Sequence, residues 1–88
     1  MMYECDNDKA ASNIAKHGIS FNEAATCLLD DMALVREDCD CATEQRWVLL
    51  GMSSQGRLLV VVYTMRGDMP RLISARKATA KERKSYEA

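Results

Sequence analysis

Apolar positions in the first third of the chain recur every three or four residues, as on one face of a helix. The first run predicts a helix that is capped by an aspartate at position 6 or 8 and carries Ala10, Ile14 and His17 on one face. A second helix is expected over residues 21–29, and a short edge strand over residues 2–5 precedes both. The residues that the second helix should bury are Phe21, Ala24, Ala25 and Leu28.

A helix stop and a helix start follow each other closely, beside the only histidine of the chain. Gly18 is suited to end the first helix because glycine adopts the left-handed conformation at little cost. Ser20 and Glu23 match a capping box, in which each side chain bonds a free backbone N–H at the start of the next helix. Lys16 and His17 remain at the C-terminal end of the first helix. There His17 is either a structural cap or a titratable group available for chemistry.

Beyond residue 31 the pattern changes to extended segments rich in Val, Leu and Ile. Strands are expected over residues 32–36, 46–52, 58–65 and 71–76, with an acidic loop at 38–44 and a hairpin turn at 53–56. The strand over 58–65 is apolar on both faces, so it should be central. Thr79 and Glu82 form a second capping box that opens a last helix. The chain is therefore predicted to be a single α+β domain over residues 1–88: a short N-terminal strand, two helices, an antiparallel sheet of about three to four further strands and a C-terminal helix.

The formal net charge of −1 conceals two segments of opposite charge. Residues 57–88 contain eight Lys or Arg against three Asp or Glu, a net charge of +5, so residues 1–56 carry −6. A basic segment suits a polyanion or an acidic partner, although mixed surface charge is its ordinary explanation. Five of the eight cations are arginines, whose planar guanidinium matches phosphate and carboxylate, and this favours an anion-binding surface.

The four cysteines do not follow the spacing of a zinc site or of a disulfide framework. Cys39 and Cys41 form a CxC pair rather than CxxC, and no second ligand pair lies at zinc-ribbon distance. No metal site is expected, and the thiols should be reduced. The sequence has no apolar run near the roughly 20 residues of a membrane span and no signal peptide, so we expect no membrane association and a cytoplasmic location.

Four blocks of sequence, in order and spread over nearly the whole chain, carry a resemblance to a known family. They are Lys16-His17-Gly18-Ile19-Ser20-Phe21, Glu44-Gln45-Arg46-Trp47, Gly56-Arg57-Leu58-Leu59-Val60 and Arg71-Leu72-Ile73-Ser74-Ala75-Arg76. In these blocks the chain resembles the BrnT toxins of type II toxin–antitoxin systems, which are similar in fold to the RelE ribonucleases. The resemblance implies a RelE-like endoribonuclease that arrests translation, uses no cofactor and is neutralised by a BrnA-type antitoxin with a ribbon-helix-helix DNA-binding domain.

Metal-free RNA cleavage requires a base for the 2′-OH, cations for the phosphorane and an acid for the leaving 5′-oxygen. Under the family interpretation, the catalytic candidates are His17, Glu44, Arg46 and Arg76. The candidates for RNA binding are Lys16, Arg71, Arg83 and Tyr86. Each also has a structural explanation: a surface salt bridge for the arginines, a solvated acidic loop for Glu44 and packing of the last helix for Tyr86.

Antitoxin contact is expected at Trp47, Arg83 and Tyr86, because aromatic and arginine side chains dominate interface energetics. A two-fold antitoxin dimer would bring two toxins into one heterotetramer, and DNA would be contacted only through the antitoxin. The competing class of function is a non-catalytic basic module that binds an acidic peptide or RNA and acts as a co-repressor. Its charge signature would be the same, so composition does not separate the two.

Overall fold

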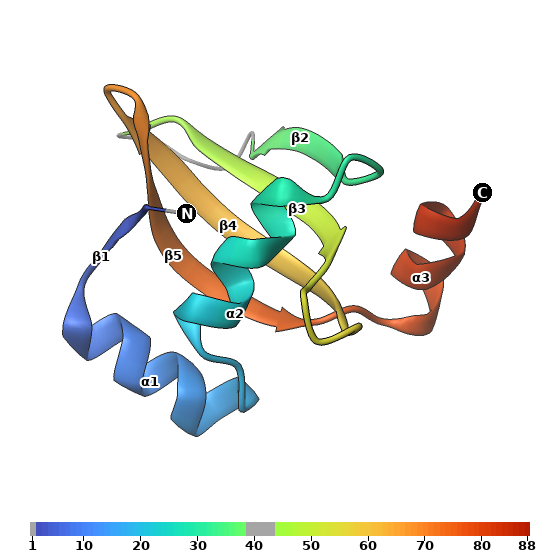
Figure 1. Cartoon of the computed structure of the whole chain (residues 1–88), viewed down its shortest axis with the longest axis horizontal. Helices are drawn as coiled ribbons and strands as arrows, with labels where there is room; N and C mark the ends of the chain where they lie inside the picture. The colour runs from blue at the N-terminus through green and yellow to red at the C-terminus, as the bar shows by residue number, and fades with distance from the viewer. Residues whose placement is uncertain (1, 39–43) are drawn as a thin grey trace.

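The computed structural model describes residues 2–38 and 44–88, and the strands of these residues form one five-stranded sheet (Figure 1). The strands are β1 (Glu4–Cys5), β2 (Leu34–Asp38), β3 (Arg46–Met52), β4 (Leu58–Arg66) and β5 (Met69–Lys77), in the spatial order β1-β5-β4-β3-β2. β1 is parallel to β5, and all other neighbours are antiparallel. The predicted α+β fold is confirmed, and the apolar strand β4 is central as expected.

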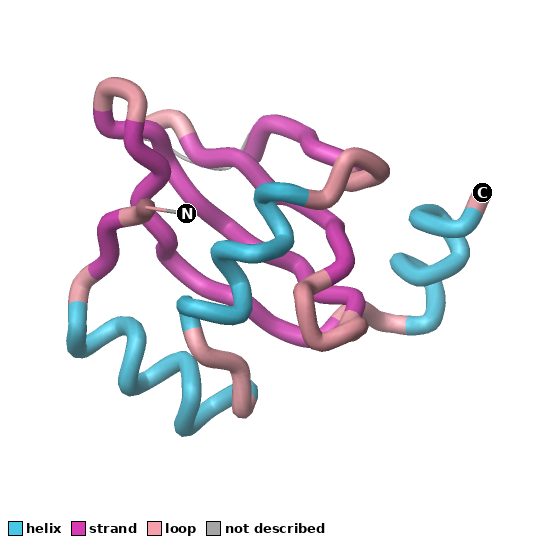
Figure 2. The backbone as a smooth tube through the Cα atoms, in the orientation of Figure 1, coloured by secondary structure: helices cyan, strands magenta, loops and turns pink. Residues whose placement is uncertain are grey.

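The first two helices lie on one side of the sheet (Figure 2). α1 (Asn7–His17) follows the outer edge of β5, and α2 (Phe21–Thr26) crosses the sheet before it continues into the 3₁₀ turn η1 (Cys27–Leu29) (Figure 1). The Asp6 carboxylate caps the start of α1, and Gly18 ends the helix in the left-handed conformation with φ 69°. The predicted helix stop is therefore confirmed.

The core lies between α2 and the face of the sheet that α2 covers. Its buried members are Ile19, Phe21, Ala24, Ala25, Cys27, Leu49, Leu59, Val61, Leu72 and Ala75. Side chains alternate along a strand, so the residues between these positions in β3, β4 and β5 lie on the opposite face, which we call the open face. Burial of one large aliphatic side chain contributes about 1.5–3 kcal/mol, so this single layer of contacts supplies most of the favourable free energy of folding.

The prediction that the second helix buries Leu28 is wrong, and the apolar face expected on the first helix is not its buried side. Ile14 of α1 is 52% exposed, whereas Asn13 is 5% exposed. α1 lies along the edge of the sheet, so its inward side meets the backbone of β5, and a polar side chain fits there. In the second helix Leu28 is only partly buried, and Cys27 is buried in its place. The tighter winding of η1 turns Cys27 toward the core.

The capping box predicted for α2 is only half formed. Ser20 accepts a hydrogen bond from the Glu23 N–H at 3.1 Å, but the Glu23 carboxylate turns away from the helix start. It accepts hydrogen bonds from Ser53 Oγ at 2.7 Å and from Arg57 Nε at 2.8 Å, and Arg57 Nη2 binds its other oxygen. A bidentate arginine is a stronger partner than one backbone N–H. The hydrogen bonds from Arg57 hold the pKa of Glu23 below its usual range.

The strand expected over residues 32–36 begins two residues later, because a turn lies between η1 and β2. The Asp30 side chain accepts a hydrogen bond from the Met32 N–H at 2.9 Å, and the Asp30 carbonyl accepts one from the Ala33 N–H at 3.1 Å. Both residues therefore belong to the turn, and β2 begins at Leu34 as an edge strand. Residues 39–43 of the expected acidic loop lie outside the described residues.

α3 (Ala80–Glu87) closes the chain and lies apart from the other two helices (Figure 1). It opens with the predicted capping box: Thr79 Oγ1 accepts from the Glu82 N–H, and the Glu82 carboxylate accepts from the Thr79 N–H. Tyr86 attaches the helix to the turn after η1, because its hydroxyl donates to the Asp30 carboxylate at 2.6 Å. Among the helices of the described residues, none has the length and apolar character needed to cross a membrane.

Candidate functional site

Residues on the open face form rows that cross the strands. The first row is Glu4, Arg71, Thr64, Arg46 and Asp38. The second row is Ser74, Val62, Val48 and Arg36. The third row is Arg76, Val60, Leu50 and Leu34. Arginines therefore stand around an apolar centre, and this arrangement suits an anionic ligand that also has apolar surface.

The first row brings two of the predicted arginines together. Arg71 is the strand partner of Thr64, and Arg46 lies on the other side of Thr64 because its neighbour Trp47 pairs with Tyr63. Neighbouring strands are almost 5 Å apart, so the Cα atoms of the two arginines are about 10 Å apart. Two extended arginine side chains can reach one phosphate group across this distance.

Arg46 and Arg71 are held only loosely by their acidic neighbours. Arg46 Nε lies 4.0 Å from Glu44 Oε1, and Arg71 Nη1 lies 3.7 Å from Glu4 Oε1. Arg46 Nε is buried and has no hydrogen-bond acceptor among the described residues. Partly exposed ion pairs of this length contribute about 1 kcal/mol or less. Both guanidinium groups are therefore available to an anion.

Arg76 lies two rows away and is tightly paired. Its Nη1 and Nη2 atoms donate to the two carboxylate oxygens of Glu82 at 2.8 and 2.9 Å, and these bonds lower the pKa of Glu82 to about 2. The pair places α3 over the third row. There Glu82 and Ser85, together with Leu50 and Val60, line an apolar groove of about 260 Å³. Arg76 thus has the structural role of anchoring α3.

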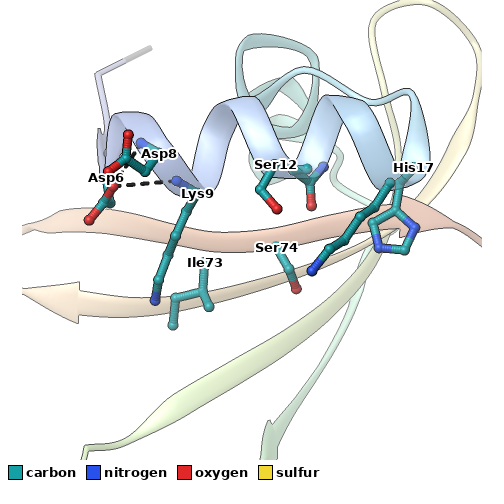
Figure 3. A pocket seen from close by; sticks show the side chains of 9 residues that line it. Asp6, Asp8, Lys9, Ser12, His17, Ile73 and Ser74 are labelled. Carbon is teal, nitrogen blue, oxygen red and sulfur yellow. Dashed lines mark hydrogen bonds between the residues drawn. The ribbon is translucent and has the colours of Figure 1, made fainter.

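A second group of predicted residues lies in an open depression of about 350 Å³ at the outer edge of β5, beneath α1 (Figure 3). β1 pairs with only the first part of β5, so the rest of this edge has no strand partner among the described residues. A bulge in the pairing with β4 allows both Ile73 and Ser74 to line the depression. Lys16 and His17 line it from the C-terminal end of α1.

Asn13 fastens α1 to this edge of the sheet. Its Nδ2 donates to the carbonyl oxygens of Ile19 and Ala75, both at 2.9 Å, and its Oδ1 accepts from the Ala75 N–H at 3.0 Å. Asn13 thereby takes the place of a strand partner at the fully buried Ala75. The same bonds hold the end of α1 that carries Lys16 and His17 against β5.

The predicted catalytic residues do not form one compact cluster. Arg46 and Glu44 lie at the first row, Arg76 lies in the third, and His17 lies at the edge of β5. Ser74 connects these places, because it belongs to the second row and also lines the depression beside His17. The side of β5 that carries its open-face residues is therefore continuous with the depression.

The three residues predicted to contact an antitoxin lie on different surfaces. Trp47 is half-buried on the helix-covered face of β3, opposite the arginines. Arg83 is exposed on α3. Tyr86 is partly buried, and its hydrogen bond to Asp30 raises the pKa of the phenol. The Tyr86 hydroxyl therefore has a packing role, which is the structural explanation given for it above.

Sequence reasoning missed three residues of these clusters: Arg36, Asn13 and Ser74. Arg36 shares the arginine face, but its place depends on a strand register that no local pattern gives. Asn13 did leave a signal, because it is a polar residue three positions after Ala10, beside the apolar face expected for the first helix. Ser74 lines the depression because of the bulge, which sequence does not reveal.

The cysteines contribute little to these clusters. Cys5 and Cys27 are free thiols, and burial raises the pKa of Cys27 to about 12, so it is a protonated core residue. Within residues 2–38 and 44–88, no three His, Cys, Asp or Glu side chains come together as a metal-ligating group. Cys39 and Cys41 lie outside the described residues.

Comparison with known proteins connects these features to a family. Residues 5–82 match the sequence model of the family described as the ribonuclease toxin, BrnT, of type II toxin–antitoxin systems. Among solved structures, the chain is similar to the ribonuclease toxin BrnT of Brucella abortus, at 26% identity and a TM-score of 0.69 over 90% of this chain and 97% of that chain. Among curated proteins, none matches the chain. The matched residues include the arginines of the three rows and all the residues that line the depression.

Proposed function

The chain belongs to the BrnT family of ribonuclease toxins of type II toxin–antitoxin systems, and we propose that it is a metal-independent endoribonuclease whose site is built on β5. One observation carries the placement of the site. Ser74, which lies on the open face of β5 as Arg71 does, lines the same depression as Lys16 and His17. An RNA strand on this side of β5 would have phosphate-binding cations and a proton carrier within one continuous surface.

The chemistry assigned to the site uses the RNA's own 2′-OH as nucleophile. The 2′-oxygen attacks the adjacent phosphorus as a base removes its proton. The bond from phosphorus to the 5′-oxygen breaks, and an acid donates a proton to the 5′-oxygen. His17 transfers one of these protons, since imidazole serves as acid and base near neutral pH and Asn13 holds its helix in place. Glu44, beside Arg46 in the first row, is the second group able to take up a proton.

Arg46 and Arg71 stabilise the phosphorane in this proposal. Their weak ion pairs leave both guanidinium groups free to contact phosphate oxygens, and their planar shape allows two bonds each. A positioned donor of this kind contributes about 3–4 kcal/mol to the transition state. Arg76 could contact the phosphorane only if its hydrogen bonds to Glu82 were broken, so its main role is to hold α3.

The partner in this proposal is a BrnA-type antitoxin with a ribbon-helix-helix domain. Membership of a type II toxin–antitoxin family supports an antitoxin partner and an RNA target. Trp47 lies on β3 and Arg83 is exposed on α3, so an antitoxin that contacts both spans these two elements. Two toxins would join one antitoxin dimer in a heterotetramer, and DNA would be bound only through the antitoxin.

Purified, antitoxin-free protein incubated with a defined RNA in excess chelator tests the proposal. We expect cleavage at the same positions with and without chelator. The His17→Ala variant should lose most of the activity, and Lys84→Ala, an exposed lysine on α3, is the matched control. Cleavage only after Mg²⁺ is restored would show that metal independence is wrong. RNA binding without cleavage under both conditions would instead favour the non-catalytic co-repressor.

A further inference from the structure

We propose that Lys9, at the N-terminal end of the depression, forms with the neighbouring Ser12 and Ser74 a second phosphate subsite that holds the RNA strand away from the cleaved bond. The ligand is the phosphodiester backbone of single-stranded RNA. The inference rests on the proposed ribonuclease function and extends it, because these three residues lie outside the set assigned to the reaction. The subsite would supply affinity and set the direction of the strand.

Two lysines and a serine that line the depression lie along one face of α1. Lys9, Ser12 and Lys16 are spaced by three and four residues, so they share a face of the helix. Figure 3 shows the Lys9 side chain extending past Ile73, while Ser74 lies between Lys9 and His17 along the strand. The surface below this face is open and accessible to a flexible polymer.

Lys9 and His17 lie at opposite ends of the depression, and Figure 3 shows the Lys9 side chain extending away from His17. The helix rises about 12 Å over the eight residues between them. This distance exceeds the spacing of neighbouring phosphates along a nucleic-acid strand. A strand with its cleaved phosphate near His17 would therefore place a different phosphate at Lys9. Ser12 and Ser74 lie between the two ends of the depression and offer hydroxyl donors to the intervening backbone.

The Lys9 ammonium is available to an anion, although two carboxylates lie at the same end of the depression. Lys9 and Lys16 form no ion pair with any other described residue. Two carboxylates also line the depression, at Asp6 and Asp8. Asp6 is occupied as the helix cap, accepting from the N–H groups of Asp8 at 2.8 Å and Lys9 at 3.3 Å. Figure 3 shows both carboxylates at the start of α1, with the Lys9 ammonium extending away from them.

A short, uncleavable 2′-O-methyl RNA oligonucleotide provides a test that is independent of cleavage. Its dissociation constant is measured over a range of salt concentrations for the wild type, Lys9→Ala, Lys9→Arg and Lys84→Ala. One phosphate contact changes the slope of log K against log salt by about 0.7 for a single strand, equivalent to about fivefold in affinity at 0.1 M salt. We expect this change in Lys9→Ala, its recovery in Lys9→Arg and none in Lys84→Ala. Inorganic phosphate should compete only at high concentration.

The possible results separate the subsite from the function on which it rests. A wild-type slope and affinity in Lys9→Ala, with normal binding by the wild type, would overturn the subsite alone. Equal losses in Lys9→Ala and Lys84→Ala would also overturn it, because they would show only the effect of net charge. No binding of the oligonucleotide by the wild type would reject both the subsite and the proposed RNA-directed function.

Discussion

Replacement of Asn13 by alanine should be among the most destabilising single changes in the protein. The substitution removes the two hydrogen bonds that Nδ2 donates to the Ile19 and Ala75 carbonyls and the one that Oδ1 accepts from the Ala75 N–H. Ile19 and Ala75 are both fully buried, so these backbone groups lose their partners inside the protein. Each orphaned group costs about 1–3 kcal/mol.

The expected loss is about 3–5 kcal/mol, in the lower half of the roughly 3–9 kcal/mol that three orphaned groups would cost, for two reasons. Water can enter through the depression that Asn13 lines and solvate some of the orphaned groups. Alanine also favours a helix interior by several tenths of a kcal/mol over asparagine. A domain of this size has a free energy of unfolding of about 4–13 kcal/mol, so Asn13→Ala would consume a large part of it.

Urea unfolding followed by far-UV circular dichroism and by Trp47 fluorescence measures this loss directly. Asn7→Ala is the matched control, because Asn7 is an exposed asparagine of the same helix and its replacement should change stability by less than about 0.5 kcal/mol. A loss below about 1 kcal/mol for Asn13→Ala would refute the reasoning. It would mean that water or neighbouring groups form hydrogen bonds with the Ile19 and Ala75 backbone groups as well as Asn13 does.

Three further predictions follow from the same contacts. Glu23→Gln should lower the free energy of unfolding by about 2–3 kcal/mol in urea titrations, since Arg57 loses a charged, buried partner. The lowered pKa values of Glu23 and Glu82, the latter about 2, mean that their stabilising contributions are present above pH 4.5 and are lost as pH falls toward 2. Glu82→Gln should accordingly flatten the acid limb of a stability–pH profile. Arg46→Ala and Arg71→Ala should each slow single-turnover RNA cleavage by about 10²–10³-fold, and lysine should restore only part. Unchanged rates in both would move the phosphate contact elsewhere.

Local sequence signals predicted the elements well because helix ends are decided by nearby atoms. Gly18 and the Thr79–Glu82 box act within a few residues, and both are found as expected. Glu23 fails the same rule because Arg57, more than thirty residues away, is a stronger partner than the nearby N–H. Similarly, Ile14 fits an apolar helical face, but α1 borders a strand edge, and its inward side is polar.

The site was predicted in its residue types but not in its arrangement. Arginine chemistry pointed to Arg46, Arg71 and Arg76. Arg71 and Arg76 are five positions apart, and only the extra residue Ile73 in the bulge places both on the face that carries Arg46. Which of these arginines are neighbours depends on the register between strands, and the bulge at Ile73 and Ser74 sets the register between β4 and β5. No periodicity in a single segment contains that information, because register is a property of two strands.

The central claim, that an RNA 2′-OH performs the cleavage without a metal, is tested most directly by changing that one oxygen. Purified protein in excess chelator is given two RNAs of identical sequence, one of which carries a single 2′-deoxy nucleotide immediately before the cleaved bond. We expect the unmodified RNA to yield a 2′,3′-cyclic phosphate and a 5′-hydroxyl end, and the modified RNA to stay intact at that position. Cleavage of the 2′-deoxy position at a comparable rate, or products with a 5′-phosphate, would contradict the account.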